Sequence, residues 1–253
     1  MVTADPWRVM RALTPARIAL GRAGHALPTR ERLACDAAHA RARAAVSMPL
    51  DVDALCRGIG PLTAPHAPLV LASAAADRAG YLLRPDLGRR LAGESRRRLE
   101  QCAQAQNGSD LVLVVADGLS TTAVARHAVP LVAAILAMRP SDWRIGPIAV
   151  VEQARVAIGD EIGAVLGVPY VAVLIGERPG MSCQDSLGIY LTRDPRPGRT
   201  DAERNCLSNV HPGGLTADAA ASRLWWLLGE ARRLGVTGVA LKDRSTAGSR
   251  LLP

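Results

Sequence analysis

Residues 111–117 have the sequence LVLVVAD, a continuous apolar run that ends in an aspartate. Such a run is typical of a β-strand that is buried on both faces of a sheet. Two similar runs follow it, PIAVVEQ at 147–153 and YVAVLIG at 170–176. Between them, apolar residues recur at helical spacing over 124–138 and 160–166. Strands that alternate with helices predict an α/β fold, with a mostly parallel, Rossmann-like sheet flanked by helices.

The chain on either side of this centre extends the pattern. A short apolar run at 68–72 predicts a further buried strand, and residues 87–106 predict a surface helix rich in arginine. Thr216 is the expected cap of a strong amphipathic helix that ends at Gly235. The sequence VTGVAL at 236–241 then predicts a last strand.

The N-terminal region differs in composition from the rest of the chain. Prolines and glycines interrupt residues 1–28, which predicts an irregular arm. We expect a helix over 30–47 whose apolar face holds Leu33, Ala37, Ala40 and Ala44. Several glycines and prolines at 48–66 predict a linker. The sequence therefore predicts a helical N-terminal extension at 1–66 and an α/β domain at 67–253.

The composition limits the class of protein. Apolar residues make up 49% of the 253, which suffices for a buried core. We find no apolar run of the roughly 18 residues that a membrane span needs. The first ten residues, MVTADPWRVM, lack the apolar segment of a secretory signal. The five cysteines form no C-x-x-C pair, so we expect free thiols, no metal site and a cytoplasmic protein without a membrane partner.

The formal net charge is +8 and comes from arginine, because Lys242 is the single lysine. A basic surface can indicate nucleic-acid binding. However, the arginines are scattered, the longest run is only 96–98, and aromatic residues that could stack on bases make up 3%. We therefore expect no nucleic-acid partner and attribute the charge to a genome that favours arginine codons, with nucleic-acid binding as the weaker alternative.

Ligands of open parallel sheets bind beyond the carboxyl ends of the strands. Residues 117–122, 176–180 and 201–209 are expected there. A G-x-G-x-x-G motif after a strand and the lysine of a phosphate-binding loop are both absent. Asp117 fits a general base or, more simply, a helix cap. No catalytic constellation follows from these segments.

Two further side chains in these segments have simple structural interpretations. Glu177 lies beside Arg178, and an exposed local ion pair would account for it. Cys206 could be a nucleophile, but His211 is the only histidine nearby in the sequence, and a lone thiol more often serves as a small buried apolar group. Neither residue by its type alone identifies a ligand.

Three motifs occur in order along the chain, IGERPG at 175–180, DSLGIYLT at 185–192 and DAERNCLSN at 201–209. With the segments 14–46, 76–91, 110–128, 154–167, 173–192 and 196–215, they resemble the small subunit of ethanolamine ammonia-lyase. The resemblance covers nearly the whole chain, and these three motifs are its most specific part.

The resemblance implies an enzyme subunit that is active only with a separate large subunit. That family's enzyme uses adenosylcobalamin to convert ethanolamine to acetaldehyde and ammonia, and its large subunit holds ethanolamine in a barrel at the shared site. The small subunit closes over the lower face of the corrin. The family's cofactor contacts carry over to Val156, Glu177 and Cys206, while no catalytic residue and no metal ligand carries over.

The resemblance also bears on assembly and location. It implies that residues 1–66 contact the large subunit, and that the cytoplasmic enzyme can reside in a bacterial microcompartment. No histidine here has an aspartate two residues before it, so the benzimidazole of the cofactor is expected to stay on the cobalt. A non-catalytic cobalamin-binding or assembly protein of the same fold is the alternative.

Overall fold

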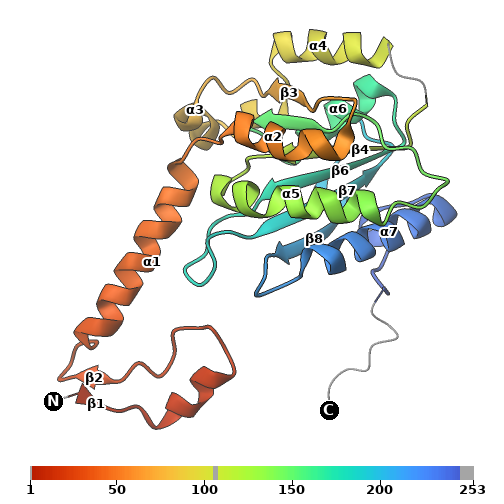
Figure 1. The fold of residues 1–253 in the computed structure, drawn as a ribbon. Helices are drawn as coiled ribbons and strands as arrows, with labels where there is room; N and C mark the ends of the chain where they lie inside the picture. Colours follow the sequence, from red (N-terminus) through yellow and green to blue (C-terminus); the bar gives the residue numbers. More distant parts are fainter. Residues whose placement is uncertain (1, 105–107, 246–253) are drawn as a thin grey trace.

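The structure, a computed structural model, describes residues 2–104 and 108–245. Its centre is a six-stranded sheet with the strand order β3-β5-β4-β6-β7-β8 (Figure 1). Strands β3, β5, β4 and β6 are parallel, whereas β7 runs antiparallel to both of its neighbours. The strands are β3 (Leu69–Ala72), β4 (Leu111–Ala116), β5 (Ala149–Glu152), β6 (Tyr170–Gly176), β7 (Leu187–Arg193) and β8 (Arg204–Val210). The predicted mostly parallel α/β sheet is confirmed.

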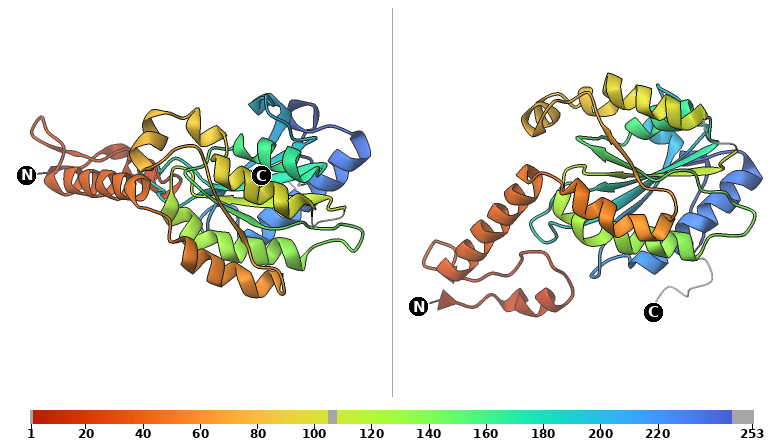
Figure 2. Two further views of the ribbon diagram at one scale, coloured as in Figure 1. Left: turned by 90° about the horizontal axis from the view of Figure 1, so that it is seen from above. Right: turned by 45° about the horizontal axis from the view of Figure 1, so that its top comes forward.

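Helices cover both faces of this sheet, as the two views of Figure 2 show. One layer holds α2 (Val52–Thr63), α5 (Thr121–Ala137) and α7 (Ala217–Leu234). The other layer holds α4 (Gly93–Gln104) and α6 (Ile158–Leu166), with the short α3 (Arg78–Leu83) beyond the strand ends. Among the described helices, none is both long and apolar enough to cross a membrane.

Strand β4 lies at the centre because its side chains are apolar on both faces. All six of its residues are buried, with Leu111, Leu113 and Val115 facing the α5 layer and the alternate residues facing the α6 layer. Trp143 closes the first layer at one end, where its ring packs on those of Tyr170 and Trp225. The predicted two-sided burial of this strand is confirmed.

Two segments differ from the structure that their sequences predict. Residues 48–66 contain α2 instead of a linker, because the Asp51 side chain accepts the Ala54 N–H at 2.8 Å and caps the helix. Gly58 lets α2 approach α5, since a Cβ there would lie 2.7 Å from a methyl group of Val129. Pro61 lies inside this helix, in its last turn, and the helix ends two residues later.

The predicted C-terminal strand at 236–241 is also wrong. This segment contains a 3-10 turn at Gly238–Ala240 and crosses the beginning of β8. Gly238 has φ of +76°, and a Cβ there would lie 2.0 Å from the carbonyl oxygen of Ala202. The Asn205 amide accepts the Gly238 N–H at 2.8 Å and donates to the Leu241 carbonyl at 2.8 Å. These contacts fix a turn where the apolar residues alone suggested a strand.

Helix α1 (Thr29–Ser47) extends away from the α/β body and carries residues 2–28 at its far end (Figure 1). The expected apolar face of α1 is wrong, because Ala38, Ala42 and Ala45 are the buried residues and Leu33 is exposed. The end of α1 is held by the body, where the Arg78 Nε donates to the Val46 carbonyl at 2.7 Å. A helix that projects in this way needs few apolar residues along its length.

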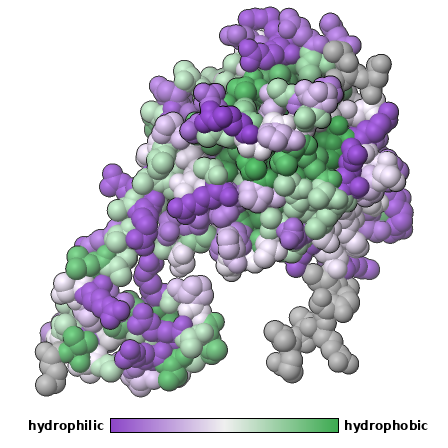
Figure 3. Space-filling model, in the orientation of Figure 1, coloured by the Kyte–Doolittle hydropathy of each residue, from purple (hydrophilic) through white to green (hydrophobic). Residues whose placement is uncertain are grey.

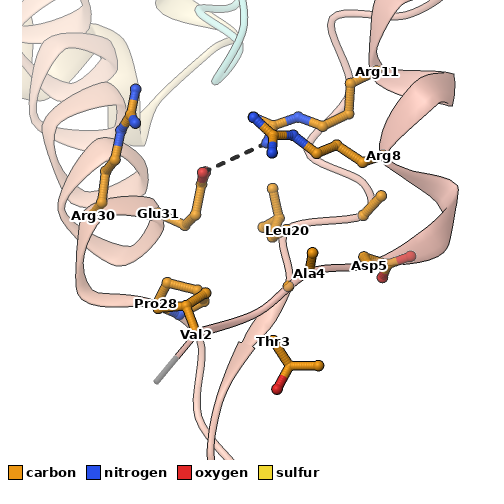
Figure 4. A pocket seen from close by; sticks show the side chains of 12 residues that line it. Val2, Thr3, Ala4, Asp5, Arg8, Arg11, Leu20, Pro28, Arg30 and Glu31 are labelled. Atoms are coloured by element: carbon orange, nitrogen blue, oxygen red, sulfur yellow. Dashed lines mark ion pairs between the residues drawn. The ribbon is translucent and has the colours of Figure 1, made fainter.

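Residues 2–28 fold back against the first turn of α1. The short strands β1 (Val2–Thr3) and β2 (Arg22–Ala23) pair there. A 3-10 helix at Pro6–Ala12 and loops connect them. They enclose a cavity of about 590 Å³. Figure 4 shows Arg11 and Glu31 pointing toward each other across it, and these two form an ion pair at 3.6 Å.

Candidate functional site

The antiparallel end of the sheet has one face that the helices leave partly uncovered. Leu187, Ile189 and Leu191 of β7 point into the α5–α7 layer and are buried. Because side chains alternate along a strand, Gly188 and Tyr190 face the α6 side. On that face Tyr190 is half-buried. The uncovered face is therefore built around Tyr190.

Cys206 lies directly across from Tyr190 on β8, since the two residues are partners in the strand register. The Cys206 side chain therefore lies beside that of Tyr190, and the cysteine as a residue is exposed. Cys206 is therefore not the buried apolar group that a lone thiol suggests. Although the residue is exposed, desolvation of its sulfur raises the pKa of Cys206, the Tyr190 hydroxyl opposes this rise, and the nearby Glu177 carboxylate adds to it. A thiol in this state is a poor nucleophile near neutral pH.

Glu177 follows β6 and joins the ends of three strands. Its backbone N–H donates to the Ser186 carbonyl at 2.9 Å. Its Oε2 accepts hydrogen bonds from the Ser186 hydroxyl and, at 3.2 Å, from the Asn209 N–H. The ion pair expected with Arg178 is not formed, so that interpretation is wrong. Within the described ranges, Oε1 accepts no hydrogen bond and remains available on the uncovered face.

Val156 approaches the same face from the turn before α6. It packs, as Tyr190 does, against the apolar cluster beneath α6, and both residues line one cavity. The structure therefore brings all three predicted residues, Val156, Glu177 and Cys206, to the surroundings of Tyr190. They come from three separate parts of the chain, because Val156 lies in the turn before α6, Glu177 directly follows β6, and Cys206 lies within β8.

A buried ion pair supports this face from below. Asp160 of α6 and Arg204 of β8 each have side chains only 2% exposed, and two hydrogen bonds of 2.6 and 2.7 Å join them. The Arg204 guanidinium also donates to Thr192 of β7 at 2.9 Å. The pair therefore fixes the position of β8, and with it Cys206, relative to α6.

Asp117 is neither a helix cap nor an accessible base. Ser120 caps α5 by accepting the Ala123 N–H at 3.2 Å. The Asp117 carboxylate is buried and accepts the N–H groups of Gln153 and Ala154, both at 2.9 Å, and pairs with Arg78 at 3.2 Å. Burial raises its pKa, and these partners oppose the rise. The predicted capping role of Asp117 is wrong.

Inspection of the sequence alone missed Tyr190, Ser186 and the two antiparallel strands. The signal was present, because DSLGIYLT alternates apolar residues at 187, 189 and 191 with Gly188, Tyr190 and Thr192. Such alternation is typical of a strand with one exposed face.

The state of the Cys206 thiol gives a testable expectation. Because its pKa is raised, alkylation by iodoacetamide should increase with pH around a midpoint above that of glutathione. Glu177→Gln should move this midpoint down, because it removes a negative charge that disfavours the thiolate. Mass spectrometry of the Cys206 peptide measures the rate, and Cys206→Ala identifies that peptide. A midpoint at or below that of glutathione contradicts the expectation.

Fold and site together define an α/β protein in which separate segments present apolar and polar side chains on one uncovered sheet face. Residues 4–242 match the model of a family described as ethanolamine ammonia-lyase light chain (EutC). The chain therefore belongs to this family of ethanolamine ammonia-lyase light, or small, subunits.

Individual relatives agree with the family match. The chain is 54% identical to the ethanolamine ammonia-lyase small subunit of Ralstonia nicotianae, covering 96% of this chain and 90% of the relative. It is 52% identical to the protein of that name from Azotobacter vinelandii, with the same coverages. For the Pseudomonas fluorescens protein the identity is 51%, over 95% and 88% of the two chains.

Proposed function

We propose that this chain is the small subunit of an adenosylcobalamin-dependent ethanolamine ammonia-lyase and holds the cobalamin against a separate large subunit. The observation that carries this proposal is the convergence of Val156, Glu177 and Cys206 around Tyr190 on an uncovered sheet face. The names of the relatives support the activity and a large-subunit partner.

The residues on this face suit a corrin, which has an apolar rim and peripheral amide groups. Val156 and the Tyr190 ring supply apolar contacts, and Glu177 Oε1 supplies an acceptor that nothing in the described chain uses. Gly188 leaves the middle of the face without a side chain. A Cβ there would lie 3.0 Å from Glu177 Oε1 and 3.1 Å from the Tyr190 ring. A flat ligand could therefore approach both side chains.

The residues on this face indicate what the cofactor and this chain would each contribute to the reaction. Adenosylcobalamin, when bound, supplies the radical chemistry, and a protein that hosts it supplies binding and orientation. Here Glu177 would orient the corrin through an amide, Tyr190 and Val156 would exclude water, and Cys206 would fill space as a neutral thiol. The deamination of ethanolamine is completed at the site shared with the large subunit.

Reconstitution tests the proposed function. The purified chain, its large subunit and adenosylcobalamin are assayed separately and together for acetaldehyde release from ethanolamine. We expect turnover only when all three are present. Turnover by the isolated chain contradicts the proposal, and corrin binding by the complex without turnover supports the non-catalytic alternative.

A substitution of Glu177 tests its role in binding. Glu177→Ala in the assembled complex should weaken adenosylcobalamin binding by about tenfold, because a hydrogen bond to a charged group is worth about 1.5–3 kcal/mol. Absorbance titration measures the affinity, and thermal melting checks that the variant is folded. Ser186→Ala is the matched control, since it removes a partner of Oε2 and leaves Oε1 in place. Wild-type affinity in folded Glu177→Ala excludes this contact.

The projecting region at the N-terminus is the surface that we assign to the large subunit. Large apolar side chains are exposed there, among them Trp7 at 68% and Leu13 at 80%. Figure 3 shows hydrophobic areas on this region beside strongly hydrophilic ones. Large exposed apolar side chains gathered in one region are typical of protein interfaces.

A further inference from the structure

A cavity of about 710 Å³ adjoins the uncovered face and shares Val156 and Tyr190 with it. Its wall lies between the turn before α6, the 3-10 helix at Leu87–Arg89 and the segment between β7 and β8. Its lining includes five arginines, Arg89, Arg90, Arg155, Arg199 and Arg204. The net charge of this cavity depends on how many of these arginines are paired with carboxylates.

Some of these arginines are already neutralised by carboxylates. Arg204 is paired with the buried Asp160, and Arg199 contacts Asp194 at 2.8 Å and also Glu203. Of the acidic groups in the lining, Glu161 is paired with Arg96 at 2.9 Å, outside the cavity wall.

Three arginines of the lining remain without a counter-charge. Within residues 2–104 and 108–245, Arg89, Arg90 and Arg155 form no ion pair. Asp201, the remaining acid of the lining, is 96% exposed and approaches Arg204 at 3.5 Å. The cavity therefore carries a surplus of positive charge that an anion would balance.

Arg155 is the most rigidly held of the three. Its backbone N–H donates to the Gly88 carbonyl at 2.7 Å, and its side chain packs on Gly88, where a Cβ would lie 2.9 Å from Arg155 Cγ. Its guanidinium lies over the Tyr81 ring at 4.2 Å, and one Nη donates to the Tyr81 carbonyl at 3.4 Å.

Other donors of this guanidinium are unused. In the described chain Arg155 Nη1 donates no hydrogen bond, and Arg155 Nε is buried without a partner. A buried donor without a partner is costly and is found mostly where a ligand or an ordered water completes the site. A fixed guanidinium with a free donor is also the group best suited to a phosphate.

We propose that this cavity binds the phosphodiester in the nucleotide tail of cobalamin, with Arg155 as its hydrogen-bond donor and Arg89 and Arg90 as supporting charges. The inference rests on the proposed cobalamin function. The phosphodiester is the acidic group on the periphery of that cofactor, and the tail leaves the corrin at its rim. A corrin on the face around Tyr190, with that edge turned toward Val156, would have its tail beside the cavity that Tyr190 and Val156 also line.

The experiment compares two probes on the complex of this chain with its large subunit. Cyanocobalamin carries the nucleotide tail, whereas cobinamide has the same corrin without phosphate, ribose or base. Affinities come from absorbance titration of the wild type, Arg155→Gln, Arg155→Lys and Arg223→Gln. Arg223 is the matched control, because it is a half-buried arginine on α7, in the opposite helix layer.

We expect Arg155→Gln to weaken cyanocobalamin binding about tenfold to a hundredfold and to leave cobinamide binding unchanged. Arg155→Lys should recover part of the loss, because it keeps the charge without the planar fork. Arg223→Gln should bind both probes like the wild type. Thermal melting of each complex checks folding.

Four results overturn the inference. Equal weakening of both probes in Arg155→Gln means that the residue acts on the corrin or on the fold, and wild-type affinity for both means that the tail lies elsewhere. A thermal shift by inorganic phosphate that depends on Arg155 but does not compete with cyanocobalamin assigns the cavity to a free anion. A wild-type complex that binds neither probe contradicts the proposed cofactor function as well, which separates the two failures.

Discussion

Replacing Asp160 by alanine is expected to lower the free energy of unfolding by about 3–5 kcal/mol. Asp160 and Arg204 are both almost fully buried and joined by two short hydrogen bonds. The substitution leaves the Arg204 guanidinium buried without its counter-charge, and desolvation of an unpaired ion outweighs the loss of the contact itself. Chemical denaturation of the purified chain measures the change.

Two controls separate this effect from a general sensitivity to charge. Asp36→Asn breaks an exposed pair with Arg32 on α1 and should cost less than about 1 kcal/mol. Combining Asp160→Leu with Arg204→Met removes both charges and should recover most of the stability. A loss below about 1 kcal/mol in Asp160→Ala would show that water or another group compensates the arginine.

Cys206→Trp should weaken adenosylcobalamin binding by about a hundredfold in the assembled complex. The residue is exposed on β8 beside Tyr190, so the indole would occupy the face to which we assign the corrin. A steric clash in a packed site costs about 1–3 kcal/mol, and the upper value corresponds to this factor. Because the side chain points away from the core, the melting temperature should change little.

The matching substitutions decide between shape and chemistry at this position. Cys206→Ala should bind cofactor within about threefold of the wild type, since the raised thiol pKa argues against a thiolate role. Ser222→Trp adds the same indole at an exposed position on α7 and should have no effect. If Cys206→Ala keeps the cofactor but loses turnover, the thiol takes part in the chemistry and the passive role is excluded.

The parallel half of the sheet could be predicted because its strands are apolar on both faces. A run such as YVAVLIG becomes β6 residue for residue, since burial on both sides selects a continuous apolar segment. The antiparallel strands were harder to predict, because β8 exposes Cys206, Ser208 and Asn209 and so lacks a simple apolar pattern. Helix α2 was missed because glycine and proline count as helix breakers unless packing against α5 is known.

The candidate site shows a similar limit. Val156, Glu177 and Cys206 were predicted from the resemblance to a family, and the structure places them around Tyr190. Residue type alone suggested a surface ion pair for Glu177 and a buried thiol for Cys206, and both interpretations were wrong. The contacts that decide these roles join residues 9 to 32 positions apart, and local sequence patterns do not report such distances.

The projecting α1 and the apolar side chains at its far end also bear on protein quality control. A newly made chain without a partner would display Trp7, Val9 and Leu13 to solvent. Chaperones and proteases select such exposed apolar segments, so unassembled copies should be short-lived and prone to aggregate. The steady amount of this chain in a cell would then follow the supply of the proposed partner more closely than the amount of its own messenger RNA.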